Sequence, residues 1–297
     1  MLRSEIRKPD RRSAQGLLRG KATVAKRTVY IGVDVGASRI KVAVIDDRAK
    51  LIGRAAAKSG IDYAGNSARC LAEALAAAGA APGDIAACVS TGYGRDNVSG
   101  ADFTRTEIAC HARGCYHQFP VAQSIIDIGG QDNKIIKLDR NGRRLSFKMN
   151  RKCAAGTGAF LEEMALRLDI PLEQMNTLAG QARDMVRLGS YCTVFSATEV
   201  LAHIRRGCRL PEIVKGLFYS MVKRVVEMDA LTDTVVMTGG VAAYNPNLVA
   251  LAEEVLSRPI RTPEHAQFTG ALGAAIFALE HARRAETEAP DGRDTHA

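Results

Sequence analysis

The chain has 297 residues, 46% of them hydrophobic and 25% charged, which suits a globular protein of two lobes better than one small core. No apolar run approaches the roughly 20 residues of a membrane span, and no apolar stretch of signal-peptide type stands at the start, so we expect a cytoplasmic protein that contacts no membrane. The net charge is +9, but most of it lies in residues 1–27, and the almost neutral remainder argues against nucleic acid as a partner.

The first 27 residues hold nine basic side chains and two acidic ones, and we expect a disordered basic arm there. The segment 28–47, "TVYIGVDVGASRIKVAVIDD", predicts two strands joined by a tight turn at Gly36-Ala37-Ser38. We place these strands at 29–33 and 40–45, followed by a helix at 66–79, a strand that enters a glycine-bearing loop at 85–98, and a helix at 103–119.

The hairpin pattern then starts again in "QSIIDIGGQDNKIIKLD", residues 123–139. Asp127-Ile128-Gly129-Gly130 stands at its turn, where Asp34-Val35-Gly36 stands in the first hairpin. Further along, 234–256 predicts a strand, a turn at Gly239-Gly240 and a helix. The other expected elements are a strand at 143–150, helices at 158–168, 171–181, 197–206 and 211–230, and a terminal helix at 268–285 before a frayed tail at 286–297.

The repeated hairpin indicates an α/β fold of two similar halves that face each other across a cleft. We place lobe I at residues 28–120 and lobe II at residues 121–267. The terminal helix, 268–285, is expected to pack back on lobe I.

Both hairpin turns have the residue types of a nucleotide site. A phosphate needs backbone N–H groups at close range, which glycine permits because it has no Cβ, and Mg²⁺ needs carboxylates held on rigid strands. "DVGASRIK" and "DIGGQDNK" each supply both features. The chain has neither a Walker GxxxxGK[ST] motif nor a GxGxxG fingerprint, so these two common phosphate-binding motifs do not account for it.

With these turns in this order, the sequence resembles the superfamily of acetate kinase, sugar kinases, heat-shock proteins and actin. The resemblance implies a two-lobed, actin-like ATPase built from duplicated ribonuclease H-like domains, with ATP and Mg²⁺ in the cleft. It further implies a first phosphate loop with Asp34, Gly36, Ser38 and Lys41, and a second phosphate loop with Asp127, Gly129 and Gly130. The adenosine loop would contain Gly239 and Gly240. Gln131 and Asp132 would orient the attacking water or the metal.

Seven cysteines form no CxxC pair, which argues against a disulfide framework in a cytoplasmic chain. Cys70 and Cys88 lie in alanine-rich surroundings typical of a core. The segment "CHARGCYHQFP" holds two cysteines and two histidines at a spacing that matches no common metal site. Its residues are Cys110, His111, Cys115 and His117. The other three cysteines are Cys153, Cys192 and Cys208.

Cys153 precedes "AAGTGAFLEEMALRL", and we expect its sulfur beside the first turn of a helix, whose N–H groups stabilise a thiolate or an anionic cluster. Cys192 is expected on a strand or at a strand–helix junction. A [4Fe–4S] cluster takes four thiolates, so two from each of two subunits would suffice. Two packing residues and a redox disulfide are the alternatives.

Together, "NRKCAAGTGAFLE", "STGYGRDNV", "SIIDIGGQDNKIIKL", "YCTVFSATEV" and "VVMTGGVAAYNPNL" resemble the activator family of 2-hydroxyacyl-CoA dehydratases, which includes the ATP-binding subunits of benzoyl-CoA reductase. The resemblance covers about residues 28–280. It implies that Cys153 and Cys192 ligate a [4Fe–4S] cluster shared with an identical or homologous subunit. It also implies a ferredoxin-type electron donor and an acyl-CoA reductase or dehydratase as the electron acceptor.

Two departures from the activator pattern favour a subunit of a larger reductase complex. These are Ser196-Ala197-Thr198-Glu199 after "TVF", where an acidic residue is usual, and the basic N-terminal extension. The sequence leaves open whether the partner reduces an aromatic ring or serves dehydration, and whether the dimer is homomeric. A small-molecule kinase, with Asp127 as general base, and a chaperone-like ATP-dependent regulator are the rival functions.

Overall fold

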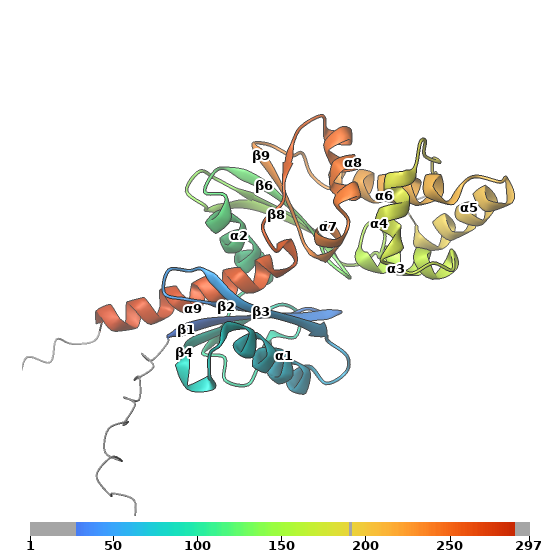
Figure 1. Cartoon of the computed structure of the whole chain (residues 1–297). Coiled ribbons are helices and arrows are strands. Elements are labelled where there is room, and N and C mark those ends of the chain that lie inside the picture. The colour runs from blue at the N-terminus through green and yellow to red at the C-terminus, as the bar shows by residue number, and fades with distance from the viewer. Residues whose placement is uncertain (1–27, 190–191, 289–297) are drawn as a thin grey trace, which may run out of the picture.

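The computed structural model describes residues 28–189 and 192–288, and its two sheets form two lobes (Figure 1). The predicted arm at 1–27 lies outside the described residues, as does the tail from residue 289 onward. Residues 286–288, predicted to be frayed, belong instead to the last turn of helix α9 (Thr269–Glu288). Within the described residues, no helix combines the length and apolar character that a membrane crossing requires.

Lobe I is built on a five-stranded sheet in the order β3-β2-β1-β4-β5. Alternate residues of the central strand β1 point to opposite faces. Val29, Ile31 and Val33 pack against helix α1, while Tyr30 packs against α9. The elements of this lobe are β1 (Val29–Val35), β2 (Arg39–Ile45), β3 (Leu51–Lys58), α1 (Tyr63–Ala78), β4 (Ile85–Thr91) and β5 (Phe103–Thr104).

Lobe II repeats this topology in the order β10-β9-β6-β7-β8. An antiparallel three-stranded unit again leads into two parallel strands, so β6 corresponds to β1 and β7 to β2. Helix α2 covers one face of this sheet, and α6 and α8 cover the other. Its elements are α2 (Glu107–Gln118), β6 (Gln123–Ile128), β7 (Asn133–Leu138), β8 (Arg144–Asn150), α3 (Gly158–Arg167), α4 (Gln174–Gln181), α5 (Thr193–Arg205), α6 (Leu210–Val226), β9 (Thr234–Thr238), α7 (Gly240–Tyr244), α8 (Pro246–Leu256) and β10 (Ile260–Arg261).

Helices α2 and α9 lie at the junction of the lobes, and each packs on the lobe opposite to the strand that precedes it in the chain (Figure 1). After β5 of lobe I, α2 packs on the sheet of lobe II, and after β10 of lobe II, α9 packs on the sheet of lobe I. The two helices touch at glycines: a Cβ on Gly273 would lie 1.8 Å from the Cys110 carbonyl oxygen, and one on Gly114 would lie 2.2 Å from that of Thr269. The predicted range of lobe I, 28–120, therefore contains one helix that covers lobe II.

Strand β3 was missed by the sequence analysis. Its sequence, "LIGRAAAK", has no alternation of apolar and polar residues and contains glycine and alanine, which are depleted in strands. The strand forms because β2 offers a free edge, along which Arg39 pairs with Lys58 and Ile45 with Leu51. Tertiary pairing thus overrides weak local propensity.

Candidate functional site: two facing hairpin turns

The turns of the β1–β2 and β6–β7 hairpins face each other at the junction of the lobes. A Cβ atom on Gly130 would lie 2.9 Å from Ser38 Oγ, so the second turn approaches the first within van der Waals contact. The Gly36 N–H donates to the Arg39 carbonyl, and the Gly129 N–H donates to the Asp132 carbonyl. Gln131 is exposed at the tip of the second turn. Two glycine-bearing turns therefore meet where the sequence predicts the phosphates.

The two hairpins carry the same charge pair. Asp34 pairs with Lys41 across β1–β2, and Asp127 pairs with Lys134 across β6–β7. In each pair the lysine Nζ contacts Oδ2 of the aspartate, at 3.2 Å in the first hairpin and 3.0 Å in the second. The Oδ1 atom of each aspartate is buried without a hydrogen-bond partner. Each aspartate thus keeps one oxygen for a ligand.

Lys134 was missed by the sequence analysis, although "DVGASRIK" and "DIGGQDNK" place a lysine at the same offset from each aspartate. Its Nζ lies 2.7 Å from Asp132 Oδ1 and 2.8 Å from Glu107 Oε1, in addition to Asp127. Burial by itself lowers the pKa of Lys134, but these three carboxylates outweigh it and hold the pKa well above its ordinary value. Lys134 is therefore a buried ammonium ion.

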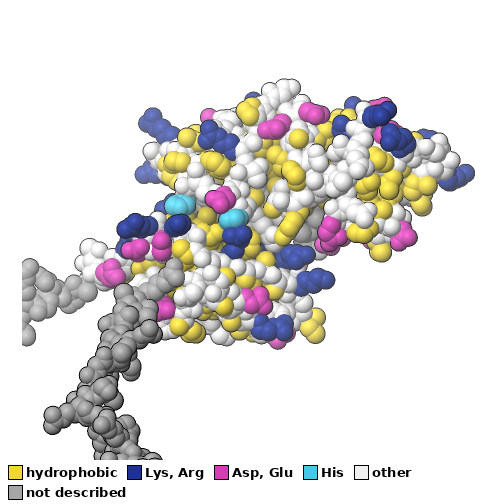
Figure 2. All heavy atoms as spheres, viewed as in Figure 1, with side chains coloured by type: hydrophobic (Ala, Val, Ile, Leu, Met, Phe, Trp, Pro, Cys, Tyr) yellow, Lys and Arg dark blue, Asp and Glu magenta, His cyan; other side chains and the backbone are white. Residues whose placement is uncertain are grey.

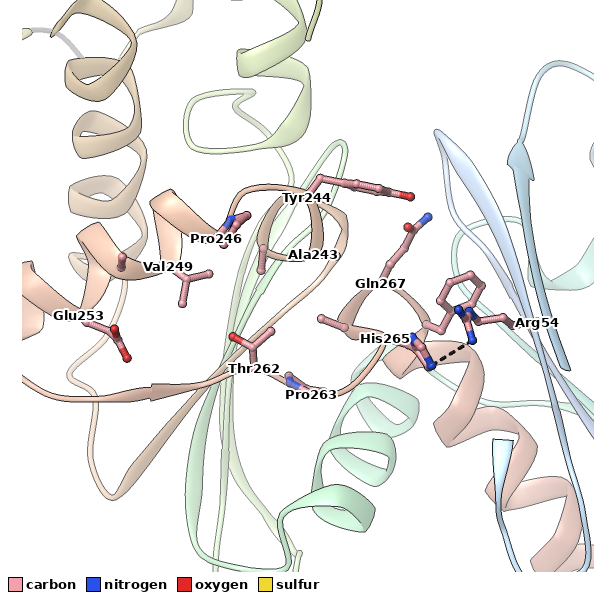
Figure 3. Close-up of a pocket in the computed structure, with 14 residues that line it drawn as sticks. Arg54, Ala243, Tyr244, Pro246, Val249, Glu253, Thr262, Pro263, His265 and Gln267 are labelled. Atoms are coloured by element: carbon pink, nitrogen blue, oxygen red, sulfur yellow. Dashed lines mark hydrogen bonds between the residues drawn. The ribbon is translucent and has the colours of Figure 1, made fainter. Parts of the chain in front are cut away.

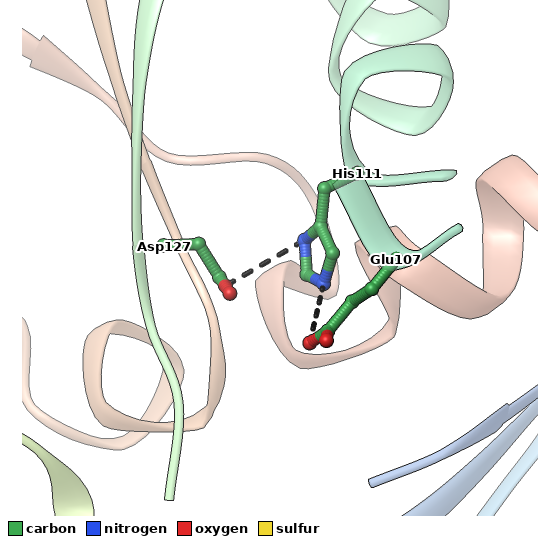
Figure 4. A group of neighbouring side chains, drawn as sticks. All are labelled: Glu107, His111 and Asp127. Carbon is green, nitrogen blue, oxygen red and sulfur yellow. Dashed lines mark ion pairs between the residues drawn. The ribbon is translucent and has the colours of Figure 1, made fainter. Parts of the chain in front are cut away.

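Glu107 and His111 of helix α2 complete the site and were also missed as site residues (Figure 4). His111 Nδ1 lies 3.6 Å from Asp127 Oδ1, and His111 Nε2 lies 3.9 Å from Glu107 Oε1. These three residues are a possible cation-ligand group, with ligand atoms within 4.8 Å of one another. Glu107 and His111 sit one helical turn apart, and only the packing of α2 on lobe II brings them to the second hairpin.

The carboxylates of this site have pKa values shifted in opposite directions. Burial raises the pKa of Glu107, and although Lys134 opposes this shift, the pKa stays above the ordinary value. Burial also raises the pKa of Asp127, but the neighbouring His111 and Lys134 outweigh it, so the pKa is lowered. Asp127 is thus held ionised, while Glu107 has a higher affinity for a proton.

The site fits a divalent cation. Four carboxylates, those of Asp34, Glu107, Asp127 and Asp132, face the two ammonium groups of Lys41 and Lys134. The excess negative charge and the two buried Oδ1 atoms without partners match a hard cation that takes oxygen ligands. The pair of glycine turns beside them matches the phosphates that would accompany it.

A third turn, Gly239-Gly240, joins β9 to α7. Gly239 has a φ of 95°, and a Cβ on it would lie 2.4 Å from the Ile128 carbonyl oxygen and 2.7 Å from Asp127 Oδ1, so only glycine fits beside the second hairpin. Helix α7 then borders a pocket of about 530 Å³ (Figure 3). Tyr244 and Gln267 lie on one side of this pocket, and Arg54 donates a hydrogen bond of 3.0 Å to His265 on another.

The cysteines divide by burial. Cys70, Cys88, Cys110 and Cys115 are buried in the cores of the lobes. Burial raises the pKa of the Cys70 thiol to about 11 and that of the Cys88 and Cys110 thiols to about 12. A neutral, buried thiol is a poor metal ligand, and the possible ligand group that contains His111 includes no cysteine.

Cys153, Cys192 and Cys208 are the cysteines that reach the surface. Cys192 is exposed and is the N-cap residue of α5, so it stands at the positive end of that helix. Helix α3 begins at Gly158, as the predicted helix at 158–168 does, and Cys153, half-buried, lies in the loop between β8 and α3. The position of its sulfur beside the first turn of that helix stays a prediction.

The surface around α5 is apolar. Val194 and Phe195, in the first turn after Cys192, are 68% and 65% exposed, and Leu201 and Ile204 of the same helix are also exposed. Figure 2 shows hydrophobic side chains gathered at the end of lobe II where α3 and α5 lie. Helix α3 contacts α5 there. An exposed apolar patch beside the exposed Cys192 is a feature of a contact surface rather than of a free helix.

Helix α3 is fixed directly to the second hairpin turn. The Gly158 N–H donates a 2.9 Å hydrogen bond to the Gly129 carbonyl, and the Ala159 N–H donates one of 2.8 Å to the Gly130 carbonyl. The Asn150 side-chain amide, at the end of β8, donates one of 3.1 Å to the Cys153 carbonyl. The loop that carries Cys153 is therefore hydrogen-bonded to β8 at one end and continues into a helix anchored on the Gly129-Gly130 turn.

Comparison with known proteins covers most of the chain. A model of the BadF/BadG/BcrA/BcrD ATPase family matches residues 31–278. The chain is 39% identical over 261 residues to the 2-hydroxyisocaproyl-CoA dehydratase activator of Clostridioides difficile, spanning 87% of this chain and 97% of the relative. It is 41% identical over 257 residues to the activator of lactoyl-CoA dehydratase of Anaerotignum propionicum, spanning 86% and 98%.

One of the subunits of the benzoyl-CoA reductase of Thauera aromatica is 32% identical over 184 residues, which span 59% of this chain and 65% of that relative. Among solved structures, the activator of the 2-hydroxyisocaproyl-CoA dehydratase from Clostridium difficile with bound ADPNP matches with a TM-score of 0.83 and 37% identity. That match covers 88% of this chain and 98% of the other. The predicted two-lobed ATPase fold and the predicted family resemblance are both confirmed.

Proposed function

The chain belongs to the BadF/BadG/BcrA/BcrD ATPase family, and from this premise we propose that it is an ATP-hydrolysing activator that delivers electrons to an acyl-CoA dehydratase. The dehydratase is preferred to a ring reductase because the relatives matched over almost their whole length are dehydratase activators. The observation that carries the proposal is the anchoring of α3 on the Gly129-Gly130 turn, which connects the Cys153 loop with the predicted phosphate site.

In this proposal the facing hairpin turns hold the phosphates of ATP at Ser38 and Gly130, where the turns meet, while Gly36 and Gly129 shape the turns through their own hydrogen bonds. Asp34 and Asp127, whose Oδ1 atoms have no hydrogen-bond partner in the described part of the chain, would hold Mg²⁺, and Lys41 would balance the charge at Asp34. Mg²⁺ supplies Lewis-acid stabilisation of phosphate charge.

Glu107 is the residue best suited to take a proton from the attacking water, because its pKa is raised and it lies in the same site. Asp132 and Gln131 border the site from the second turn. In the kinase alternative, Asp127 would be the base, but its lowered pKa makes it a weak one.

The pocket beside α7 is assigned to the nucleoside. Its volume of about 530 Å³ lies within the usual range for small-molecule sites, about 300–1,000 Å³. Gly239 lies beside Asp127, and helix α7, which begins at Gly240, supplies Ala242, Ala243 and Tyr244 to the pocket lining, an arrangement that suits an adenosine loop. Tyr244 offers an aromatic ring for stacking on the base.

Cys153 and Cys192 are assigned as ligands of a [4Fe–4S] cluster, completed by the same pair from a second copy of this chain or a homologue. A cluster of this kind supplies low-potential one-electron transfer. The donor set fits because four of the other cysteines are buried and because the α5 N-terminus favours an anionic group beside Cys192. Burial of Val194 and Phe195 against the second subunit accounts for their exposure in the single chain.

Nucleotide state is then transmitted by α3. A shift of the Gly129-Gly130 turn on nucleotide binding or hydrolysis carries Gly158 and Ala159 with it through their hydrogen bonds, and with them the loop of Cys153. Solvent exposure and hydrogen bonding around the cysteine sulfurs set the potential of a bound cluster. ATP can bias this movement only by its difference in affinity for the two arrangements.

Anaerobic purification tests the proposal. We expect a brown dimer with about four iron and four sulfide per two chains, ATP hydrolysis, and electron transfer from reduced ferredoxin to a dehydratase. A colourless, iron-free protein that phosphorylates a sugar or an acid would replace the proposal with the kinase. Electron transfer to a benzoyl-CoA reductase instead of a dehydratase would replace only the partner.

A further inference from the structure

Lys134 is a buried cation for which the proposed nucleotide chemistry has no use. Its side chain is 1% exposed, and three carboxylates from three segments surround its Nζ: Glu107 from α2, Asp127 from β6 and Asp132 from the turn. The Nζ–oxygen distances are 2.8, 3.0 and 2.7 Å. Burying such an ion is costly unless all its charge is matched, and here three anions match one cation.

Its counterpart Lys41 has a different environment. Lys41 contacts one carboxylate, that of Asp34, and its side chain is 19% exposed. The duplicated fold therefore places equivalent lysines on both hairpins, but only the second lysine stands at the centre of a carboxylate cage. Neutralising one aspartate, as Lys41 does, would not need three carboxylates around the lysine. This asymmetry therefore suggests a further role for the Lys134 ammonium.

The geometry points to the Lys134 ammonium as a built-in substitute for a divalent cation, which closes the Glu107–Asp127–Asp132 cage to free metal. The inference rests on the proposed metal–nucleotide site. Oxygen atoms from these residues and the His111 imidazole are the ligand types that Mn²⁺ and Mg²⁺ accept. With the ammonium in place, the buried carboxylate oxygens without a hydrogen-bond partner among the described residues are the Oδ1 atoms of Asp34 and Asp127. Metal then enters together with the phosphates, which supply its remaining ligands.

The consequence is an ordered assembly of the site. Nucleotide-free protein holds Lys134 in the cage and takes up no divalent cation, so Glu107 remains paired with Lys134. Replacing the ammonium by a neutral side chain of similar length leaves three carboxylates facing one vacant position. Such a position has the charge and the oxygen ligands of a divalent-cation site.

The test is Mn²⁺ binding, measured by electron paramagnetic resonance on nucleotide-free protein. Wild type is expected to bind no Mn²⁺ at micromolar concentrations unless a non-hydrolysable ATP analogue is present. Lys134→Met is expected to bind one Mn²⁺ without nucleotide, with a dissociation constant at least about tenfold lower than that of wild type. Lys41→Met, the matched variant on the other hairpin, is expected to bind no extra Mn²⁺.

Equal Mn²⁺ binding by nucleotide-free wild type and Lys134→Met would overturn the inference. Wild type that binds no Mn²⁺ even with the ATP analogue would instead overturn the proposed metal–nucleotide site, so the two failures are distinguishable. If Lys134→Met folds poorly, its melting temperature is expected to rise by several degrees on addition of Mn²⁺, because a ligand that binds only the folded state stabilises it. A variant that Mn²⁺ does not stabilise also overturns the inference.

Discussion

The backbone N–H of Ala159 donates a 2.8 Å hydrogen bond to the carbonyl of Gly130. This bond joins the second residue of α3 to the turn that faces Ser38 across the lobes. It is a direct connection between the predicted phosphate site and the segment that carries Cys153. The first test therefore removes this bond and leaves both ends in place.

Ala159→Pro deletes the N–H donor, and proline is tolerated in the first turn of a helix, so α3 should persist. Loss of the bond is expected to cost about 1 kcal/mol of unfolding free energy. We expect ATP hydrolysis to continue while the nucleotide-dependent change in the cluster's paramagnetic resonance spectrum disappears. Ala159→Gly retains the N–H group and serves as the control. A spectrum that still responds to nucleotide in Ala159→Pro would show that the Ala159–Gly130 bond is not needed for transmission and would leave the Gly158–Gly129 bond as the route.

Cys153→Ala and Cys192→Ala are each expected to abolish the brown chromophore while nucleotide still binds, because each removes half of the thiolates supplied by one chain. Iron content and nucleotide affinity measured on the same sample separate the two effects. Cys208→Ala, at another cysteine that reaches the surface, and Cys70→Ala, at a buried one, should keep their iron. Full iron content in Cys153→Ala would refute the ligand assignment.

Asp34→Asn and Asp127→Asn are expected to lower the rate of ATP hydrolysis by about 100-fold or more, because each neutralises a carboxylate that holds the metal. The cluster should be unaffected, so absorbance of the chromophore is the internal control. If both variants turn over at the wild-type rate, these aspartates do not belong to the metal site.

Glu107→Gln is expected to reduce the rate of ATP hydrolysis by about 10²–10⁴-fold if Glu107 accepts the proton of the attacking water. The pKa of Glu107 is raised above its ordinary value of 4.5, so this base is lost as pH falls through that raised pKa. The acidic limb of the kcat/KM profile should therefore lie above pH 4.5 in wild type and vanish in the variant. A residual limb at the same position would assign it to another group.

Gly273→Ala is expected to destabilise the protein by about 1–3 kcal/mol, because the new Cβ would lie 1.8 Å from the Cys110 carbonyl oxygen and force α2 and α9 apart. Urea denaturation measures the change. Gly83→Ala is the matched control, since nothing lies within 4 Å of a Cβ at that position. Equal stability of the two variants would show that the helix crossing accommodates a methyl group.

The predictable part of the fold came from local pattern. Alternating apolar residues and glycine turns located both hairpins. Gly79, the last residue of the predicted helix at 66–79, is the C-cap of α1 and has the left-handed conformation common at helix ends. Helix α5 was expected to begin at residue 197, but it begins at Thr193, because "CTVF" reads as a β-type run when its exposure is unknown. Local propensity could not decide between a strand and the first turn of a helix for this segment.

By itself, the sequence determined the duplicated hairpin, with an aspartate before each glycine turn and a lysine at the same offset, because residues paired on adjacent strands are close in the chain. Only the tertiary structure decided which other side chains join them. Glu107 and His111 reach Asp127 because α2 crosses to lobe II. Burial, which depends on the whole packed molecule, separates the buried thiols from Cys153 and Cys192. Contacts between segments far apart in the chain leave no periodic signal, so no local pattern could have revealed them.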